Sequence, residues 1–178
     1  MTEFLPWPKT VRVAGEADEA ALFDLLMALY KDNGVGIPPR PQDVRAAIQA
    51  GTRNGAESGV LIGVIDGPDG ILIGTVCVMP STFWYNTSPE YGYLAERWLF
   101  VRPEFRKGHT LHDDLFQAAR CYKRQAEIAL GKRVPLVSSV TSFKRLSAKM
   151  RLYRKYGRLC GGIYEIDPVI AVAARKAA

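Results

Sequence analysis

The stretch LFVRPEFRKGHT, residues 99–110, decides the predicted fold. It reads as the end of a strand that stops at Pro103, then a tight basic turn, then the start of a helix. The first turn of a helix presents unpaired backbone N–H groups and a partial positive charge. With Arg106, Lys107 and Gly108 in the turn, this helix start suits a pyrophosphate, although an ordinary basic surface turn has the same composition.

Upstream of this stretch, the apolar patterns predict two helices and then three consecutive strands. Helical spacing of leucines ends at Asn33-Gly34, and a proline opens a second helix. The tetrapeptide GPDG at 67–70 predicts a hairpin turn between two apolar runs. The expected elements are strand Thr10–Ala14, helices Glu16–Lys31 and Pro41–Gln49, and strands Gly59–Asp66, Gly70–Met79 and Tyr93–Val101, with a loop at 81–92.

Downstream, a long helix is expected over Thr110–Leu130, closed by Gly131. Pro135–Val140 reads as an interior strand, Phe143–Tyr156 as a helix, and Ile163–Ile166 as a last strand. Three consecutive strands followed by strand–helix–strand units imply an α/β (α+β) fold: a mixed sheet with helices on its faces.

Length and composition predict one domain in the cytoplasm. The chain has 178 residues, 48% of them hydrophobic, and shows no apolar run long enough to span a membrane. The N-terminal stretch MTEFLPWPKT lacks the character of a signal peptide. Cys77, Cys121 and Cys160 are far apart and are expected to be reduced, buried thiols. His109 and His112 fit no metal motif, so no metal is expected.

The net charge of +6 is unevenly distributed. Residues 1–96 contain six Lys and Arg against twelve Asp and Glu, whereas residues 97–158 contain sixteen against four. The basic half predicts a polyanionic partner, either nucleic acid or a phosphate-rich cofactor.

Two motifs resemble those of the GNAT superfamily of N-acetyltransferases. The family's acyl-CoA motif is V-x-P-x-x-R-x-x-G-x-G/A, which Val101, Pro103 and Arg106 match in register. His109 and Leu111 stand where the family has its glycines, and Gly108 lies one place early. Further along, LYRKYG at 152–157 resembles the late helix of the family, commonly L-Y-x-K-x-G. The resemblance covers about residues 9–166 and leaves an N-terminal arm at 1–8 and a tail at 167–178.

The resemblance implies transfer of an acetyl group from acetyl-CoA, as co-substrate, to a primary amine. It implies that Tyr153 protonates the departing thiolate and that Glu96 deprotonates the amine, with Tyr91, Tyr93 and Ser139 as weaker alternatives. Each of these side chains could instead serve packing or a surface salt bridge. The implied cofactor-binding residues are the strand segment Leu99, Phe100 and Val101, for the pantetheine, and the turn Arg106, Lys107, Gly108, His109, Thr110 and Leu111, for the phosphates.

Two other functions remain open at this stage. The divergent glycines are compatible with a GNAT-like domain that binds CoA but has lost activity or transfers another acyl group. The basic segment is compatible with a nucleic-acid-binding module, although it lacks clustered stacking aromatics and a helix-turn-helix pattern. The acidic half would favour a cationic acceptor, and Phe83, Trp84 and Tyr85 could either line its pocket or anchor the loop into the core. The alanine-rich tail could pair with a second subunit.

Overall fold

A computed structural model of the chain describes residues 6–33, 38–82, 87–88, 90, 92–107, 110–138 and 146–156. The chain divides into two compact units, Met1–Leu146 and Ser147–Ala178. Helix α5 (Leu146–Tyr156) is the described part at the start of the second unit. The predicted last strand, Ile163–Ile166, and the C-terminal tail lie outside the described residues.

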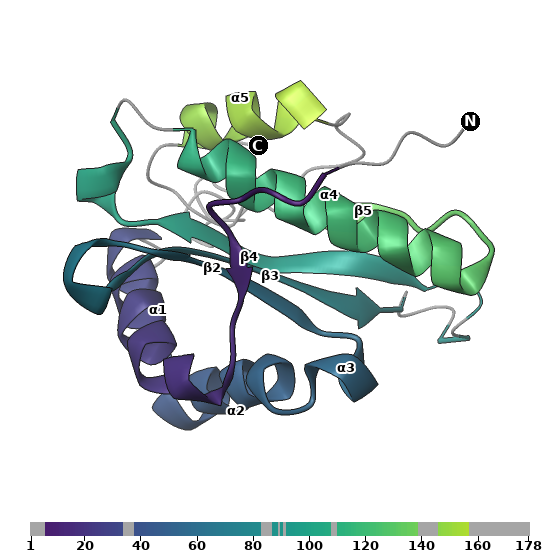
Figure 1. Cartoon of the computed structure of the whole chain (residues 1–178), viewed down its shortest axis with the longest axis horizontal. Helices are drawn as coiled ribbons and strands as arrows, with labels where there is room; N and C mark the ends of the chain where they lie inside the picture. Colours follow the sequence, from purple (N-terminus) through teal and green to yellow (C-terminus); the bar gives the residue numbers. More distant parts are fainter. Residues whose placement is uncertain are drawn as a thin grey trace, which may run out of the picture. The chain divides into compact units, whose positions relative to one another are not determined.

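The first unit is built on a mixed sheet whose strands lie in chain order (Figure 1). Neighbouring strands are antiparallel from β1 to β4, and β5 joins β4 in parallel. This arrangement confirms the predicted meander followed by a helical crossover. The strands are β1 (Arg12–Val13), β2 (Leu61–Asp66), β3 (Leu72–Ser81), β4 (Tyr93–Val101) and β5 (Leu136–Ser138).

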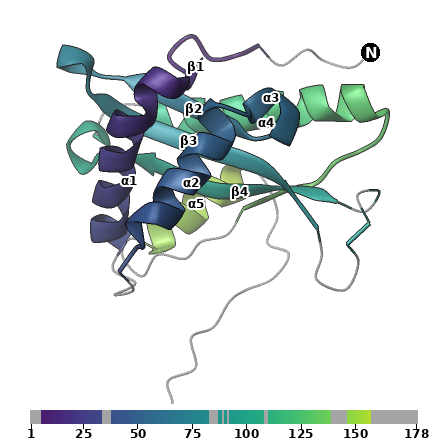
Figure 2. The same cartoon turned by 90° about the horizontal axis from the view of Figure 1, so that it is seen from below.

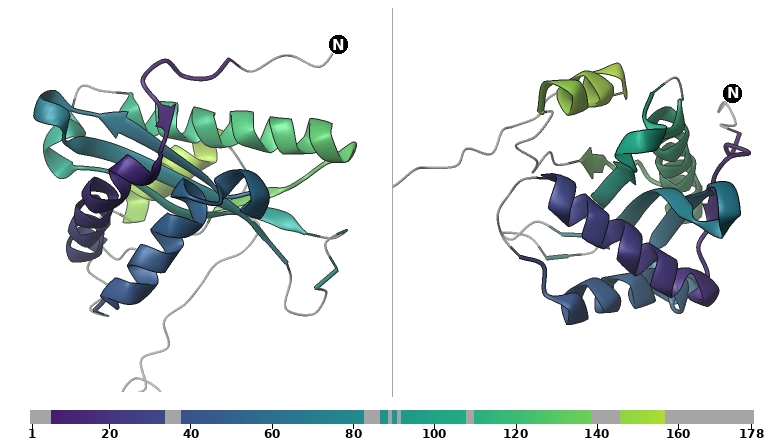
Figure 3. Two further views of the ribbon diagram at one scale, coloured as in Figure 1. Left: turned by 60° about the horizontal axis from the view of Figure 1, so that its bottom comes forward. Right: turned by 90° about the vertical axis from the view of Figure 1, so that its left-hand side faces the viewer.

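Helices cover both faces of this sheet. Helices α1 (Glu19–Asn33) and α2 (Pro41–Thr52) lie on one face, and α4 (Leu111–Leu130) lies on the other (Figures 2 and 3). Strands β2 and β3 are therefore buried on both faces, which accounts for their nearly continuous apolar sequences. The α4-side core includes Val76, Val78 and Leu115, and the α1/α2-side core includes Leu22, Leu25 and Ile62.

Local departures from the predicted boundaries have identifiable causes. Strand β3 continues through Pro80 to Ser81 because β4 pairs with it to its end. A short helix, α3 (Gly55–Ser58), follows α2 and was not predicted. The predicted hairpin turn forms as a 3-10 turn over Pro68–Gly70, in which Asp69 and Gly70 have positive φ angles of 57° and 73°. Glycine adopts this conformation readily, so the final glycine of GPDG fits its place in the turn.

Strand β4 contains a bulge at Arg97. Cys77 of β3 pairs with Trp98, but its neighbour Val78 pairs with Glu96, so Arg97 is the extra residue on β4. The bulge reverses the alternation of side chains along the strand. Trp98 and Phe100 therefore pack on the α1/α2 side, whereas Leu94 packs on the α4 side.

Two of the three cysteines lie in the described part of the chain, and both are buried thiols that form no disulfide, as predicted. Cys77 is 2% exposed and Cys121 is 4% exposed. Burial raises the pKa of Cys77 to about 12 and raises that of Cys121 as well. Cys160 lies outside the described residues.

Candidate active site

The first component of the candidate site is the edge of β4 beyond its pairing with the described part of β5. The described part of β5 pairs with β4 only at Leu94–Glu96. The N–H of Arg102 donates to Ile73 of β3 at 2.8 Å. Because backbone groups alternate in direction along an antiparallel pair, the N–H and C=O groups of Leu99 and Val101 point away from β3. These groups form the edge at which the sequence predicted a bound pantetheine.

The turn after β4 is the second component. A 3-10 turn over Pro103–Phe105 follows the strand, and α4 begins at Leu111. Lys107 and Thr110 are exposed, as expected for groups that meet a ligand, whereas Leu111 packs against the α4-side core. Gly108 and His109 lie outside the described residues.

Arg106 is held by contacts within the protein. Its Nε donates to the Val101 carbonyl at 2.7 Å, and its Nη2 donates to Asp32 Oδ2 at 2.8 Å. The guanidinium carbon lies 5.2 Å from the centroid of the Phe100 ring. The side chain of Arg106 is only 15% exposed. Arg106, which the sequence predicted to bind phosphate, thus connects β4 to the end of α1. A phosphate that binds Arg106 must share the guanidinium with Asp32.

Acidic residues occupy the first turn of α4. Asp113 and Asp114 lie there, and Asp114 Oδ2 accepts a hydrogen bond from the hydroxyl of Thr10 at 2.8 Å. Carboxylates at a helix N-terminus stabilise the helix through its dipole. The same carboxylates lower the positive potential that the helix start would offer a phosphate.

Glu96, the predicted base, is buried at 6% exposure. Its register partners are Val78 on β3 and Ser138 on β5. Cross-strand partners share a face of the sheet, and Val78 belongs to the α4-side core, so Glu96 lies on the α4 side. A base role for Glu96 requires the amine, or a water that relays its proton, to reach that side of β4.

Of the alternative bases and the predicted acid, the structure describes Tyr93 and Tyr153. Tyr93 pairs with Ser81, two residues beyond Met79, which packs on the α1/α2 side. Tyr93 and Glu96 therefore lie on opposite faces, and the structure does not bring them together. Tyr153 lies in α5, in the second unit, and its catalytic role stays a prediction. Tyr91, Ser139 and the aromatic residues 83–85 lie outside the described residues.

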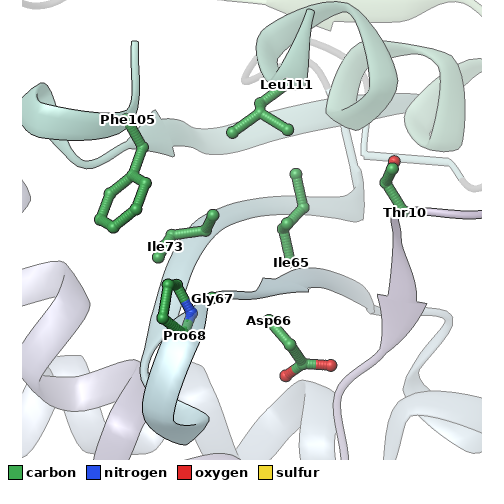
Figure 4. A pocket seen from close by; sticks show the side chains of 8 residues that line it. All are labelled: Thr10, Ile65, Asp66, Gly67, Pro68, Ile73, Phe105 and Leu111. Carbon is green, nitrogen blue, oxygen red and sulfur yellow. The ribbon is translucent and has the colours of Figure 1, made fainter. Parts of the chain in front are cut away.

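A hollow of about 480 Å³ lies beside the start of α4. The side chains of Ile65, Ile73, Phe105 and Leu111 face one another across it, with the β2–β3 turn at its rim (Figure 4). Its lining includes Phe105 and Leu111, which flank the turn after β4, but no residue of β4 or β5. We therefore place the candidate site at the β4 edge and the following turn, and not in the hollow.

Two features of the site were missed in the sequence. The bulge at Arg97 leaves no periodic signal, because a single extra residue only shifts the phase of a short strand. Asp32 is 74 residues from Arg106, and nothing in the spacing of either residue indicates their contact.

Further properties concern metals and membranes. Within the described ranges, no cluster of three or more His, Cys, Asp or Glu side chains is arranged to hold a metal ion. None of the helices described has the length and apolar character needed to cross a membrane.

Known proteins resemble this chain in structure, at low sequence identity. No protein-family model and no curated protein sequence matches it. Solved structures do match. An acetyltransferase from Trypanosoma brucei is 19% identical with a TM-score of 0.54, over 88% of this chain and 97% of that one. An aminoglycoside antibiotic 6'-N-acetyltransferase from Acinetobacter baumannii is 12% identical with a TM-score of 0.61, over 88% and 96%.

A third match is a predicted acetyltransferase from Clostridium acetobutylicum, whose structure was determined with acetyl-CoA. It is 13% identical with a TM-score of 0.57, over 90% of this chain and 96% of that one. Likeness at such low identity shows the fold. The chain therefore has the fold of the GNAT acetyltransferases, as its two motifs predicted.

Proposed function

We propose that this chain is an N-acetyltransferase that moves an acetyl group from acetyl-CoA to a primary amine by direct transfer. One observation carries the proposal: the backbone groups of Leu99 and the N–H of Val101 point away from β3, along an edge that runs into the basic turn before α4. An extended amide-containing ligand can add to such an edge by backbone hydrogen bonds. Exposed Lys107 and the start of α4 lie where that edge ends.

The chemistry asks the chain for three contributions. The thioester of acetyl-CoA supplies the acetyl group, and the edge of β4 orients it. Glu96 takes the proton of the amine, directly or through water, since a carboxylate can act as a general base. Tyr153 supplies the proton that the departing thiolate requires. Both residue roles are part of the proposal.

The proposed acceptor is a cationic amine. Residues 1–96, which supply α1, α2 and the first strands, contain twelve acidic against six basic residues. A rim of that sign attracts cations and steers them toward the site. At least three of the structural neighbours are named aminoglycoside acetyltransferases, and aminoglycosides carry several amines, which supports including such compounds among the first acceptors tested.

The first test is calorimetric titration of the chain with acetyl-CoA. Lys107→Ala should weaken binding about threefold to tenfold and reduce its salt sensitivity, because an exposed charge contributes roughly 1 kcal/mol and is screened by salt. Lys9→Ala, another lysine replacement in the first unit and outside the site, is the matched control. An unchanged dissociation constant for Lys107→Ala would remove this turn from the proposal.

The second test is a panel of amines, including aminoglycosides, polyamines and peptide N-termini, with acetylated products detected by mass. A second candidate function, a CoA-binding protein without transfer, is supported by the divergent turn, in which His109 and Leu111 stand at the glycine positions of the family motif. Tight binding of acetyl-CoA with no product from any amine would support this second candidate.

A further inference from the structure

The contact between Asp32 and Arg106 joins two parts of the chain that flank the proposed site. Asp32 is in the last turn of α1, and Arg106 follows the 3-10 turn after β4. The two side chains are 30% and 15% exposed, and their Oδ2 and Nη2 atoms are 2.8 Å apart. Ion pairs shielded to this degree are screened by salt much less than pairs on the open surface.

Arg106 also closes one position of the β4 edge. Its Nε donates a hydrogen bond to the carbonyl of Val101, which is one of the backbone groups that point away from β3. The edge that a ligand can use therefore ends with the N–H of Val101 and the backbone groups of Leu99. The Phe100 ring on the same strand packs against the guanidinium and helps to fix its plane.

These contacts give Arg106 a different role from that of Lys107. Asp32 offsets the charge of Arg106, and two of its nitrogen atoms already donate within the protein. Lys107, the next residue in the same turn, is exposed. Arg106 therefore shapes the turn, and Lys107 attracts the phosphates.

We propose that Asp32 is a positioning residue for the cofactor site: it holds Arg106 on the Val101 carbonyl and so fixes the end of the β4 edge and the turn before α4. This inference rests on the proposed function. It also makes the end of α1, on the side of the acidic half of the chain, part of the structure that shapes the cofactor site. Arg106 acts through its geometry, and the electrostatic attraction for phosphate is left to Lys107.

The test compares Asp32→Asn with Asp24→Asn, an exposed aspartate on the same helix. Asp32→Asn should weaken acetyl-CoA binding about threefold to tenfold, a loss of one contact of ordinary strength. The salt dependence of binding should stay as in the wild type, and turnover at saturating acetyl-CoA should stay within about twofold. Asp32→Glu should restore part of the affinity, and Asp24→Asn should change none of these values.

If Asp32 instead competes with phosphate for Arg106, Asp32→Asn will bind acetyl-CoA more tightly and with a steeper salt dependence, and the positioning role is wrong. Unchanged affinity would also overturn it.

Hydrogen exchange separates this inference from the proposed function. In the protein without ligand, Asp32→Asn should speed amide exchange at residues 101–107 and leave the C-terminal half of α4 as in the wild type. If the wild type binds no acetyl-CoA, the proposed function fails. The positioning role of Asp32 is then decided by this measurement, and unchanged exchange at 101–107 would refute it.

Discussion

Replacing Glu127 with glutamine should destabilise the segment between α4 and β5, which leads into the pairing of β5 with β4. The Glu127 carboxylate accepts hydrogen bonds from Lys123 Nζ at 2.6 Å, Arg124 Nη1 at 3.4 Å and the backbone N–H of Val134 at 3.2 Å. Its side chain is only 11% exposed. Val134 is followed by Pro135, whose carbonyl accepts from the N–H of Leu94 at the start of the β4–β5 pairing.

The expected loss of stability depends on which hydrogen bonds a glutamine at position 127 can still accept. Its carbonyl oxygen can still accept from Val134, so the variant loses the negative charge and the charge-assisted part of the bonds. A partly shielded carboxylate that accepts hydrogen bonds from two cations and one backbone N–H contributes about 1–2 kcal/mol to the free energy of unfolding. For a chain of this size, the midpoint of thermal unfolding should fall by roughly 2–8 °C.

The loss should also depend on pH in a defined direction. Burial raises the pKa of Glu127, but the bonds from Lys123 and Val134 outweigh it, and the pKa lies below its ordinary value of 4.5. A carboxyl whose pKa is depressed by folding stabilises the protein above the unfolded pKa, and that contribution is lost as pH falls through the folded value. The difference between wild type and Glu127→Gln should therefore be full at pH 7 and shrink toward pH 3.

Urea unfolding at both pH values, followed by tryptophan fluorescence, measures this difference. Glu57→Gln, at an exposed position in α3, is the matched control and should lie within about 0.5 kcal/mol of the wild type. A Glu127→Gln variant as stable as the wild type at pH 7, or a loss of equal size at pH 7 and pH 3, would refute the reasoning.

Other outcomes test the proposed chemistry and the core. Glu96→Gln should lower turnover over the pH range in which the wild-type carboxylate is ionised, with acetyl-CoA affinity intact, and wild-type rates across that range would assign the buried carboxylate to the core. Tyr153→Phe should lower turnover about 10²–10⁴-fold, and a loss below about threefold would mean that water protonates the thiolate. Leu115→Ala, at a fully buried position, should cost about 2–5 kcal/mol of stability, whereas Ile128→Ala, 66% exposed on the same helix, should cost far less.

The fold could be predicted because its signals are local. The apolar runs of β2 and β3, the GPDG turn between them and the helical spacing of α1 and α4 each lie within a few residues in the sequence. Boundaries were less accurate where a neighbouring element decided them. Pro80 would end an isolated strand, but pairing with Leu94 carries β3 past it.

The site was predicted in outline only, for a related reason. The motif after β4 indicated which residues lie near the turn, but the direction of the Arg106 side chain depends on Asp32, at the end of another helix. The face on which Glu96 lies depends on the bulge at Arg97, which reverses the phase of the strand. Contacts between distant segments and single-residue changes of register leave no periodic pattern in a sequence.

The two buried thiols of the first unit can report on opening of its sheet. Thiolates are the species that attack disulfide reagents, and with a pKa of about 12 only on the order of one Cys77 side chain in 10⁵ is ionised at pH 7. Cys77 and Cys121 are also 2% and 4% exposed, so an aromatic disulfide reagent should reach them only when the surrounding structure opens. CoA released by the proposed reaction, a free thiol in water, would react at once. In a Cys160→Ser variant, the same reagent would therefore follow the proposed turnover as a fast reaction and the opening of the core around Cys77 as a much slower one.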